Sequence, residues 1–139
     1  CLAVLEHIHA EQTRLIDRAM RGPADLPERL RAFQEWAERT IGDPAWTGLE
    51  CEFAAHARNR PELRAELARR EESVRQLLAT VIDRTAKDLD AALPMPAPDA
   101  AAALLSLGIG LGVRRMVDPA TPVDVLTDTL RLLLSSASA

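Results

Sequence analysis

The sequence contains no tyrosine, and tryptophan and phenylalanine occur only twice each. Valine, isoleucine and threonine together supply only 20 of the 139 residues, whereas alanine supplies 24 and leucine 21. β-Branched and aromatic residues favour strands, while alanine, leucine, glutamate and arginine favour helices. The composition therefore excludes an all-β fold or a doubly wound parallel sheet, and it predicts an all-α fold. A chain of this length is expected to form one domain, residues 1–139, with its own core.

Positive charge is also scarce, with 17 basic against 21 acidic residues and a formal net charge of −4. The basic residues form no cluster of the kind that binds nucleic acid, so direct contact with DNA is not expected. Cys1 and Cys51 form no CxxC pair, which fits reduced thiols in a cytoplasmic protein. There is no signal peptide and no run of 18 uninterrupted apolar residues, so no membrane contact is expected.

Prolines, glycines and capping residues divide the sequence into six expected helices. These span about residues 2–21, 25–41, 43–58, 61–92, 99–117 and 121–134. Asp25, followed three residues later by Glu28, is the expected N-cap of the second helix, and Pro61 opens the fourth. Residues 94–98 carry three alternating prolines and are expected to form an extended linker, with Asp99 capping the fifth helix.

The last two expected helices carry unusual amounts of apolar surface. From Ala100 to Val113 only Ser106 has a polar side chain, so this helix must be covered on every side. The sixth helix carries leucines on one face and Val125 and Leu132 on another. A small domain cannot cover all of this surface, which predicts a homodimer built on these two helices. The candidate interface residues are Leu104, Leu107, Gly108, Leu111, Leu126, Leu130 and Leu133.

Two motifs invite a chemical interpretation, and neither supports one. The glycines of Gly108–Gly112 lie inside a helix and lack the preceding strand of a nucleotide-binding loop, so helix packing is their predicted role. Glu6-x-x-His9 matches one unit of a di-iron helical bundle, but such a site needs a second copy that the sequence lacks. No Ser/His/Asp or Cys/His arrangement occurs either. The sequence therefore predicts no enzyme activity, no metal site and no cofactor.

Several polar residues fall on the apolar faces of the first four helices, close to the few aromatic side chains. A buried polar group costs about 1–3 kcal/mol if it is left unpaired. These groups could pair with one another, for example Glu52 with His56, or Arg70 with a glutamate of the third helix. Alternatively, they converge on an apolar cavity that binds a ligand. The candidate pocket residues are His9, Gln12, Arg29, Phe33, Trp36, Trp46, Phe53, His56, Arg70 and Val74.

Three segments occur in a familiar order. Residues 46–64 contain Leu49-x-x-Glu52-Phe53, then Ala57-Arg58, then Pro61-x-Leu63-Arg64. Residues 104–111 are followed by Asp118-Pro119, and residues 3–6 read Ala-Val-Leu-Glu. Together these segments resemble the C-terminal part of TetR-family transcriptional regulators: its central segment, its next-to-last helix and the start of its first helix.

This resemblance implies the ligand-sensing and dimerisation domain of a bacterial repressor, in which the last two long helices form a four-helix bundle with a second copy. The family's N-terminal helix-turn-helix head is expected to be absent from this chain, which does not begin with methionine. The expected partners are a second copy and a small, largely apolar effector, with DNA contacted only through the head. The alternative is a helical adaptor or structural bundle that binds no ligand.

Overall fold

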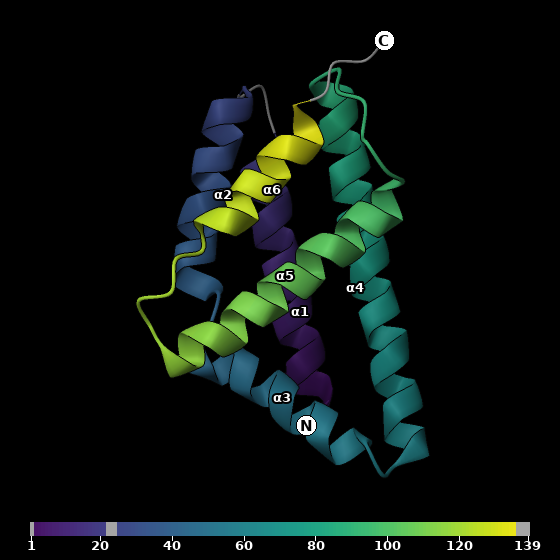
Figure 1. Ribbon diagram of the computed structural model, residues 1–139. Helices are drawn as coiled ribbons and strands as arrows, with labels where there is room; N and C mark the ends of the chain where they lie inside the picture. The colour runs from purple at the N-terminus through teal and green to yellow at the C-terminus, as the bar shows by residue number, and fades with distance from the viewer. Residues whose placement is uncertain (1, 22–24, 136–139) are drawn as a thin grey trace.

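The computed structural model describes residues 2–21 and 25–135, and the regular elements in these ranges are helical. The helices are α1 (Leu2–Met20), α2 (Leu26–Thr40), α3 (Leu49–Ala57), α4 (Pro61–Asp88), α5 (Ala97–Val117) and α6 (Asp124–Leu134). A π-helical turn, η1 (Pro44–Gly48), precedes α3. The expected all-α fold with six helices is confirmed. In Figure 1, α1 runs between α2 and α4, while α5 and α6 cross in front and α3 closes the lower end.

The starts of α2, α4 and α5 follow from a capping residue or a proline. The Asp25 carboxylate accepts a hydrogen bond from the backbone N–H of Glu28 at 3.1 Å, so the predicted N-cap of α2 is confirmed. Pro61 stands in the first turn of α4, as expected. The expected linker over residues 94–98 is wrong at its end, because α5 begins at Ala97 and not after Asp99. Pro98 fits the first turn of α5, where a helix needs no backbone N–H.

Three other boundaries differ from the expectation. The sixth helix begins at Asp124 and not at residue 121. The expected third helix is divided into η1 and α3, and the N–H of Thr47 donates to the carbonyl of Asp43 at 2.8 Å where this segment begins. The fourth helix ends at Asp88 rather than near residue 92, because Asp90 adopts a left-handed φ of 52°. Aspartate tolerates this conformation better than most residues. The stop expected at Gly22-Pro23 lies outside the described residues.

The core depends on small side chains where helices approach closely. Ala37 of α2 and Ala100 and Ala101 of α5 are fully buried, and α5 packs along α4. Phe33 and Trp36 of α2 supply the large side chains of the same core, each about 5% exposed or less. The abundance of alanine thus serves helix packing as well as helix formation.

Two glycines mark the closest approach between α5 and the segment that follows α2. Gly42 has a φ of +83°, and a Cβ added there would lie 2.7 Å from Cβ of Arg115. A Cβ on Gly112 would lie 3.1 Å from Oγ1 of Thr47. The predicted packing role of the glycine run is therefore confirmed at Gly112, whereas Gly110 faces open space.

By length and composition alone, α5 is also apolar enough to cross a membrane. The sequence predicts no membrane-spanning segment, because it lacks a run of 18 uninterrupted apolar residues. The core helix of a folded domain meets the same criteria. In this fold α5 packs on α4 and α6, while Ile109, Val113 and Met116 remain 42–44% exposed.

Replacing Gly42 by alanine should destabilise the domain, because the new Cβ meets Arg115 and the backbone is left-handed there. We expect the free energy of unfolding to fall by about 1–3 kcal/mol, measured by urea denaturation with circular dichroism. Gly108→Ala is the matched control, since its Cβ would make only an ordinary contact with Ile41 at 3.7 Å. That variant should be as stable as the parent or gain up to about 1 kcal/mol. Equal losses in both variants would contradict the close approach at Gly42.

Candidate functional site

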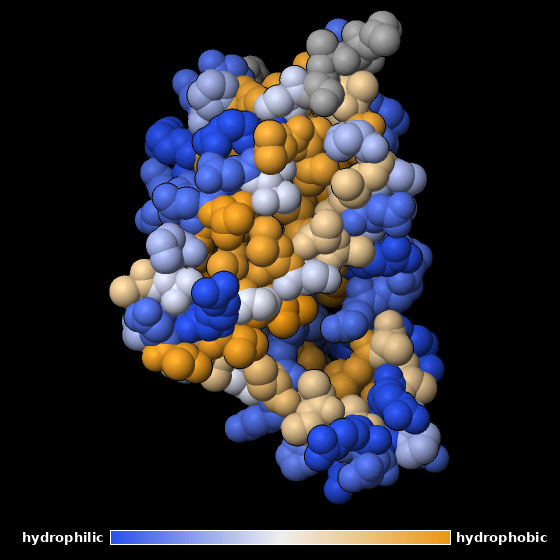
Figure 2. All heavy atoms as spheres, viewed as in Figure 1, coloured by the Kyte–Doolittle hydropathy of each residue, from blue (hydrophilic) through white to orange (hydrophobic). Residues whose placement is uncertain are grey.

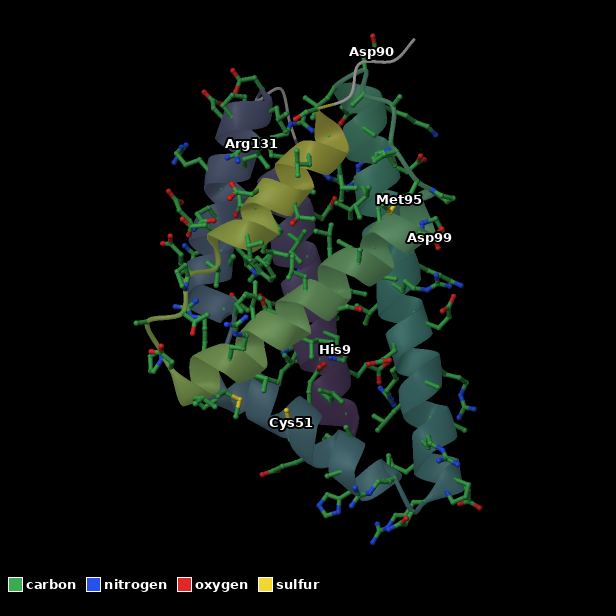
Figure 3. All side chains as sticks on the ribbon, in the orientation of Figure 1. His9, Cys51, Asp90, Met95, Asp99 and Arg131 are labelled. Atoms are coloured by element: carbon green, nitrogen blue, oxygen red, sulfur yellow. The ribbon has the colours of Figure 1, made fainter. Side chains whose placement is uncertain are left out.

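A cavity of about 360 Å³ lies among the helices. Its walls come from α1, α2, α4 and α5, with one residue each from α3 and α6 and Ile41 from the segment after α2. Figure 2 shows the surface hollowed below α5, between α5, α3 and α4, and Figure 3 labels His9 at the same place. The volume lies at the small end of the range for pockets that bind small molecules.

The inner end of the cavity, called the floor below, is apolar. It consists of Phe33, Trp36, Leu78, Leu104 and Leu126, all of which are less than 9% exposed. The rings of Phe33 and Trp36 lie with their centroids 5.4 Å apart and their planes tilted by 35°. Such a floor favours the aromatic or aliphatic part of a ligand, since burying apolar surface drives its binding.

One hydrogen bond determines how the indole of Trp36 is presented. Trp36 Nε1 donates to Gln12 Oε1 at 2.8 Å, which joins α2 to α1 across the cavity wall. The indole N–H is thereby satisfied although its ring is buried. Because the amide oxygen of Gln12 is occupied by this bond, its NH₂ group is the donor that Gln12 can offer to a ligand.

A second polar contact joins α1 to α3 beside the cavity. His9 Nε2 lies in hydrogen-bond contact with the carboxylate of Glu50, and both residues line the cavity. The His9 side chain is 11% exposed and that of Glu50 is 22% exposed. The hydroxyl of Thr13, which also lines the cavity, donates to the backbone carbonyl of His9 at 2.9 Å.

Charged side chains of α4 border the cavity where it meets solvent. Arg75 donates from Nε and Nη2 to the two carboxylate oxygens of Glu72, at 2.9 and 2.7 Å. These hydrogen bonds hold the pKa of Glu72 below its ordinary value, so Glu72 is ionised at neutral pH. Glu71 is exposed beside this pair. Below, Glu50, Glu71, Glu72 and Arg75 are called the mouth.

The comparison with protein families identifies the domain. The family described as "BetI-type transcriptional repressor, C-terminal" matches residues 27–137, which include nearly all of α2 and the whole of α3 to α6. The chain belongs to this family. It is a TetR-type C-terminal domain of a transcriptional regulator, so the resemblance noted in the sequence is confirmed. No curated protein and no solved structure matches the chain.

The cavity of this TetR-type domain brings together half of the expected pocket residues: His9, Gln12, Phe33, Trp36 and Val74. Phe53 is half-buried and His56 exposed, and neither lines the cavity. The side chain of Trp46 lies outside the described part of the structure.

The two arginines expected in the pocket lie elsewhere, because each makes hydrogen bonds or ion pairs with a neighbouring helix. Arg29 is 3% exposed and donates from Nη1 to the carbonyl of Met20 at 2.7 Å, with the carboxylate of Asp88 at 3.7 Å. It therefore links the ends of α1 and α4 away from the cavity. Arg70 donates to Glu6 of α1 at 2.7 Å and pairs with Glu66 of its own helix at 3.1 Å. Internal pairing thus occurs for Arg70, although not with a glutamate of α3.

No metal site emerges from the one Glu-x-x-His unit. Glu6 pairs with Arg70, and His9 contacts Glu50 instead. Within residues 2–21 and 25–135, no three or more His, Cys, Asp and Glu side chains are grouped so that they could hold a metal ion.

The residues expected at a dimer interface are turned toward the chain's own interior. Five of them are 2–6% exposed, namely Leu104, Leu111, Leu126, Leu130 and Leu133. Leu107 is partly buried against the core, and Gly108 lines the cavity together with Leu104 and Leu126. Other apolar side chains of α5 and α6 are exposed, and the term outer face is used below for five of them: Ile109, Val113, Met116, Val125 and Leu132. Ile109 also lines the cavity.

The charged residues that α4 contributes to the mouth were not predicted from the sequence. Ala68, Glu71, Arg75 and Leu78 recur at three- and four-residue intervals, which places them on one face of the helix. This stripe passes from small and charged residues to a buried leucine, so a mixed face borders the cavity. From this helix only Arg70 and Val74 were named as pocket candidates from the sequence, and charged residues of a helix usually face solvent.

Replacing Gln12 by leucine should leave the buried indole N–H of Trp36 without its acceptor. We expect the free energy of unfolding to fall by about 1–3 kcal/mol, measured by urea denaturation with circular dichroism. Gln76→Leu on the exposed side of α4 is the matched control and should change stability little. A loss at Gln12 no larger than the loss at Gln76 would show that this hydrogen bond does not hold α1 to α2.

Proposed function

We propose that this TetR-type domain senses an effector and that the cavity is its binding site. The effector is a small molecule with a large apolar part, and its binding controls DNA recognition by the regulator to which the domain belongs. The observation that carries this proposal is the cavity of about 360 Å³ beside Phe33 and Trp36, with an apolar floor and a few polar groups. This combination is typical of small-molecule sites.

The alternative of an adaptor bundle without a ligand calls for tight packing around the aromatic residues. Trp36 instead borders open volume, although its indole N–H is bonded to Gln12. A cavity that leaves apolar side chains unpacked is costly for a purely structural bundle, which gains stability by burying them. The cavity therefore favours a sensing domain.

The signal from the cavity is proposed to travel through α1. Four residues of α1 line the cavity, namely His9, Gln12, Thr13 and Ile16. A ligand that contacts them changes how α1 packs on α2, α3 and α4. In the family arrangement that the resemblance implies, the DNA-reading head precedes this helix, so two packings of α1 correspond to two positions of the head. Such a regulator acts on DNA and is proposed to be cytoplasmic.

A homodimer is proposed to form through the outer face of α5 and α6. On α5, Ile109, Val113 and Met116 are 42–44% exposed at helical spacing; on α6, Val125 is 47% and Leu132 73% exposed. Figure 2 shows hydrophobic atoms gathered over these two crossing helices. A contiguous apolar surface of this kind marks an interface more often than it remains in water. A second copy covering it also accounts for the apolar composition of α5 without a membrane.

Ligand binding is tested with N-phenyl-1-naphthylamine, a neutral apolar fluorophore, in a Trp46→Phe background that leaves Trp36 as the reporter. We expect saturable energy transfer from Trp36, because the probe would occupy the floor beside it. Val74→Phe, which places a larger side chain in the cavity, should weaken binding at least tenfold. The matched control Leu77→Phe, on an exposed position of α4, should not. Non-saturable transfer, or equal affinity in both variants, would refute the proposed site.

The dimer is tested by sedimentation velocity over the micromolar range. The parent domain should sediment as a dimer, and Val113→Glu or Leu132→Glu should yield monomers because each places a charge in the apolar interface. Leu77→Glu is the control, since Leu77 is 52% exposed on α4 and lies off the outer face. A monomeric parent, or a dimer that survives both glutamates, would exclude this interface.

A further inference from the structure

Several hydrogen-bond donors of the cavity lining are already in use within the protein. The indole of Trp36 donates to Gln12 at 2.8 Å, and Arg75 donates to both carboxylate oxygens of Glu72, at 2.9 and 2.7 Å. The hydroxyl of Thr13 donates to a backbone carbonyl of its own helix at 2.9 Å. These three groups can donate to a ligand only by giving up a partner inside the protein.

The amide of Gln12 is different, because only its oxygen is engaged. An indole N–H donates and cannot accept, so Oε1 of Gln12 must be the atom that faces Trp36. This bond settles the orientation of the amide, whose oxygen and nitrogen could otherwise be exchanged. Among residues 2–21 and 25–135, Nε2 of Gln12 has no hydrogen-bond partner, although Gln12 lines the cavity. The cavity wall therefore presents an N–H donor whose direction is determined by Trp36.

This donor stands at the edge of the apolar floor. Gln12 is bonded to Trp36, whose ring lies 5.4 Å from that of Phe33. Gln12 also follows His9 by three residues on α1, and Figure 3 labels His9 at the hollow below α5. The floor carries no charge, so an ionised group placed here would lose hydration without gaining an ion pair. A group with only N–H donors would find Oε1 of Gln12 occupied.

The geometry points to an uncharged ligand that carries a carbonyl oxygen on an apolar body, with Gln12 as the residue that selects it. This inference rests on the proposed function, because it names the ligand class of the same cavity. The carbonyl oxygen of a ketone, ester or amide accepts from Nε2 of Gln12 while the apolar body covers the floor. A hydrocarbon of the same shape would bury that N–H without an acceptor, which weakens binding.

The test compares two ligands of the same shape: 2-acetylnaphthalene and 2-isopropenylnaphthalene, in which a CH₂ group replaces the carbonyl oxygen. Each displaces N-phenyl-1-naphthylamine from the Trp46→Phe domain at pH 8. The measured quantity is the ratio of their dissociation constants, alkene over ketone. This ratio is compared between variants, because the alkene leaves water more readily than the ketone whichever variant binds it.

Gln12→Glu removes the donor and keeps an acceptor for Trp36, since a carboxylate has two acceptor oxygens and no proton to donate. We expect the ratio to fall at least fivefold, about the size of one net hydrogen bond. Gln76→Glu is the matched control, because Gln76 is exposed on α4 and does not line the cavity. The same substitution there should leave the ratio unchanged.

A vibrational measurement on the parent domain keeps the test independent of how well the variant folds. The C=O stretch of a ketone falls in frequency when its oxygen accepts a hydrogen bond. We expect isotope-labelled 2-acetylnaphthalene to absorb at lower frequency when bound than in hexane, in infrared difference spectra. The band should move back toward the hexane value in Gln12→Glu and not in Gln76→Glu.

The outcomes separate the ligand class from the proposed function. If the bound ketone absorbs as it does in hexane, or neither naphthalene displaces the fluorophore, the carbonyl class is overturned while the cavity remains a binding site. If Gln12→Glu changes neither the band nor the ratio, or if Ser106→Ala removes the shift instead, Gln12 is not the selecting residue. If the fluorophore itself does not bind saturably, the proposed function and the ligand class fail together.

Discussion

Polar contacts from α1 hold the walls of the cavity in place. Gln12 accepts from Trp36 of α2, and His9 contacts Glu50 of α3. On the α4 side, Glu6 accepts from Arg70 and Asp17 from Arg84. These contacts are spread along the length of α1, so the helix is tied to three neighbours around a volume that apolar packing does not fill. Directional hydrogen bonds suit this task, because apolar contacts alone would favour collapse of the cavity.

Small residues allow the same fold to be compact elsewhere. Ala100 and Ala101 are fully buried where α5 packs along α4, and Gly112 lies against Thr47 at the other end of the helix. Close approach at both ends positions α5 over the cavity, so that Leu104 and Gly108 border it from above. The alanine and glycine content that identifies the chain as helical therefore also determines where its open volume lies.

The positions of the helices could be predicted from the sequence more reliably than the side of each helix that faces the core. Local signals decide where many helices begin, so Asp25 as a cap and Pro61 as an opening residue were predictable. The tolerance of a first turn for Pro98, the division of the third helix and the start of α6 at Asp124 were not. Faces depend on which neighbours surround a helix. Leu126 and Gly108 were expected at a dimer interface because α5 and α6 are apolar on several sides, and periodicity alone does not say which side meets the chain's own core. Arg29 and Arg70 were correctly placed near apolar surface, but their partners lie on other helices and leave no sequence signal.

The two faces of α5 connect the site to the proposed interface. Leu104 and Gly108 border the cavity, Val113 and Met116 belong to the outer face of the same helix, and Ile109 belongs to both. A helix moves as a unit over a few turns, because its backbone hydrogen bonds are shared along its length. A ligand that displaces the inner side of α5 would therefore also displace the surface that meets a second copy. Effector binding and dimer geometry would then be thermodynamically linked in both directions, so that dimerisation changes ligand affinity as much as the ligand changes dimer stability.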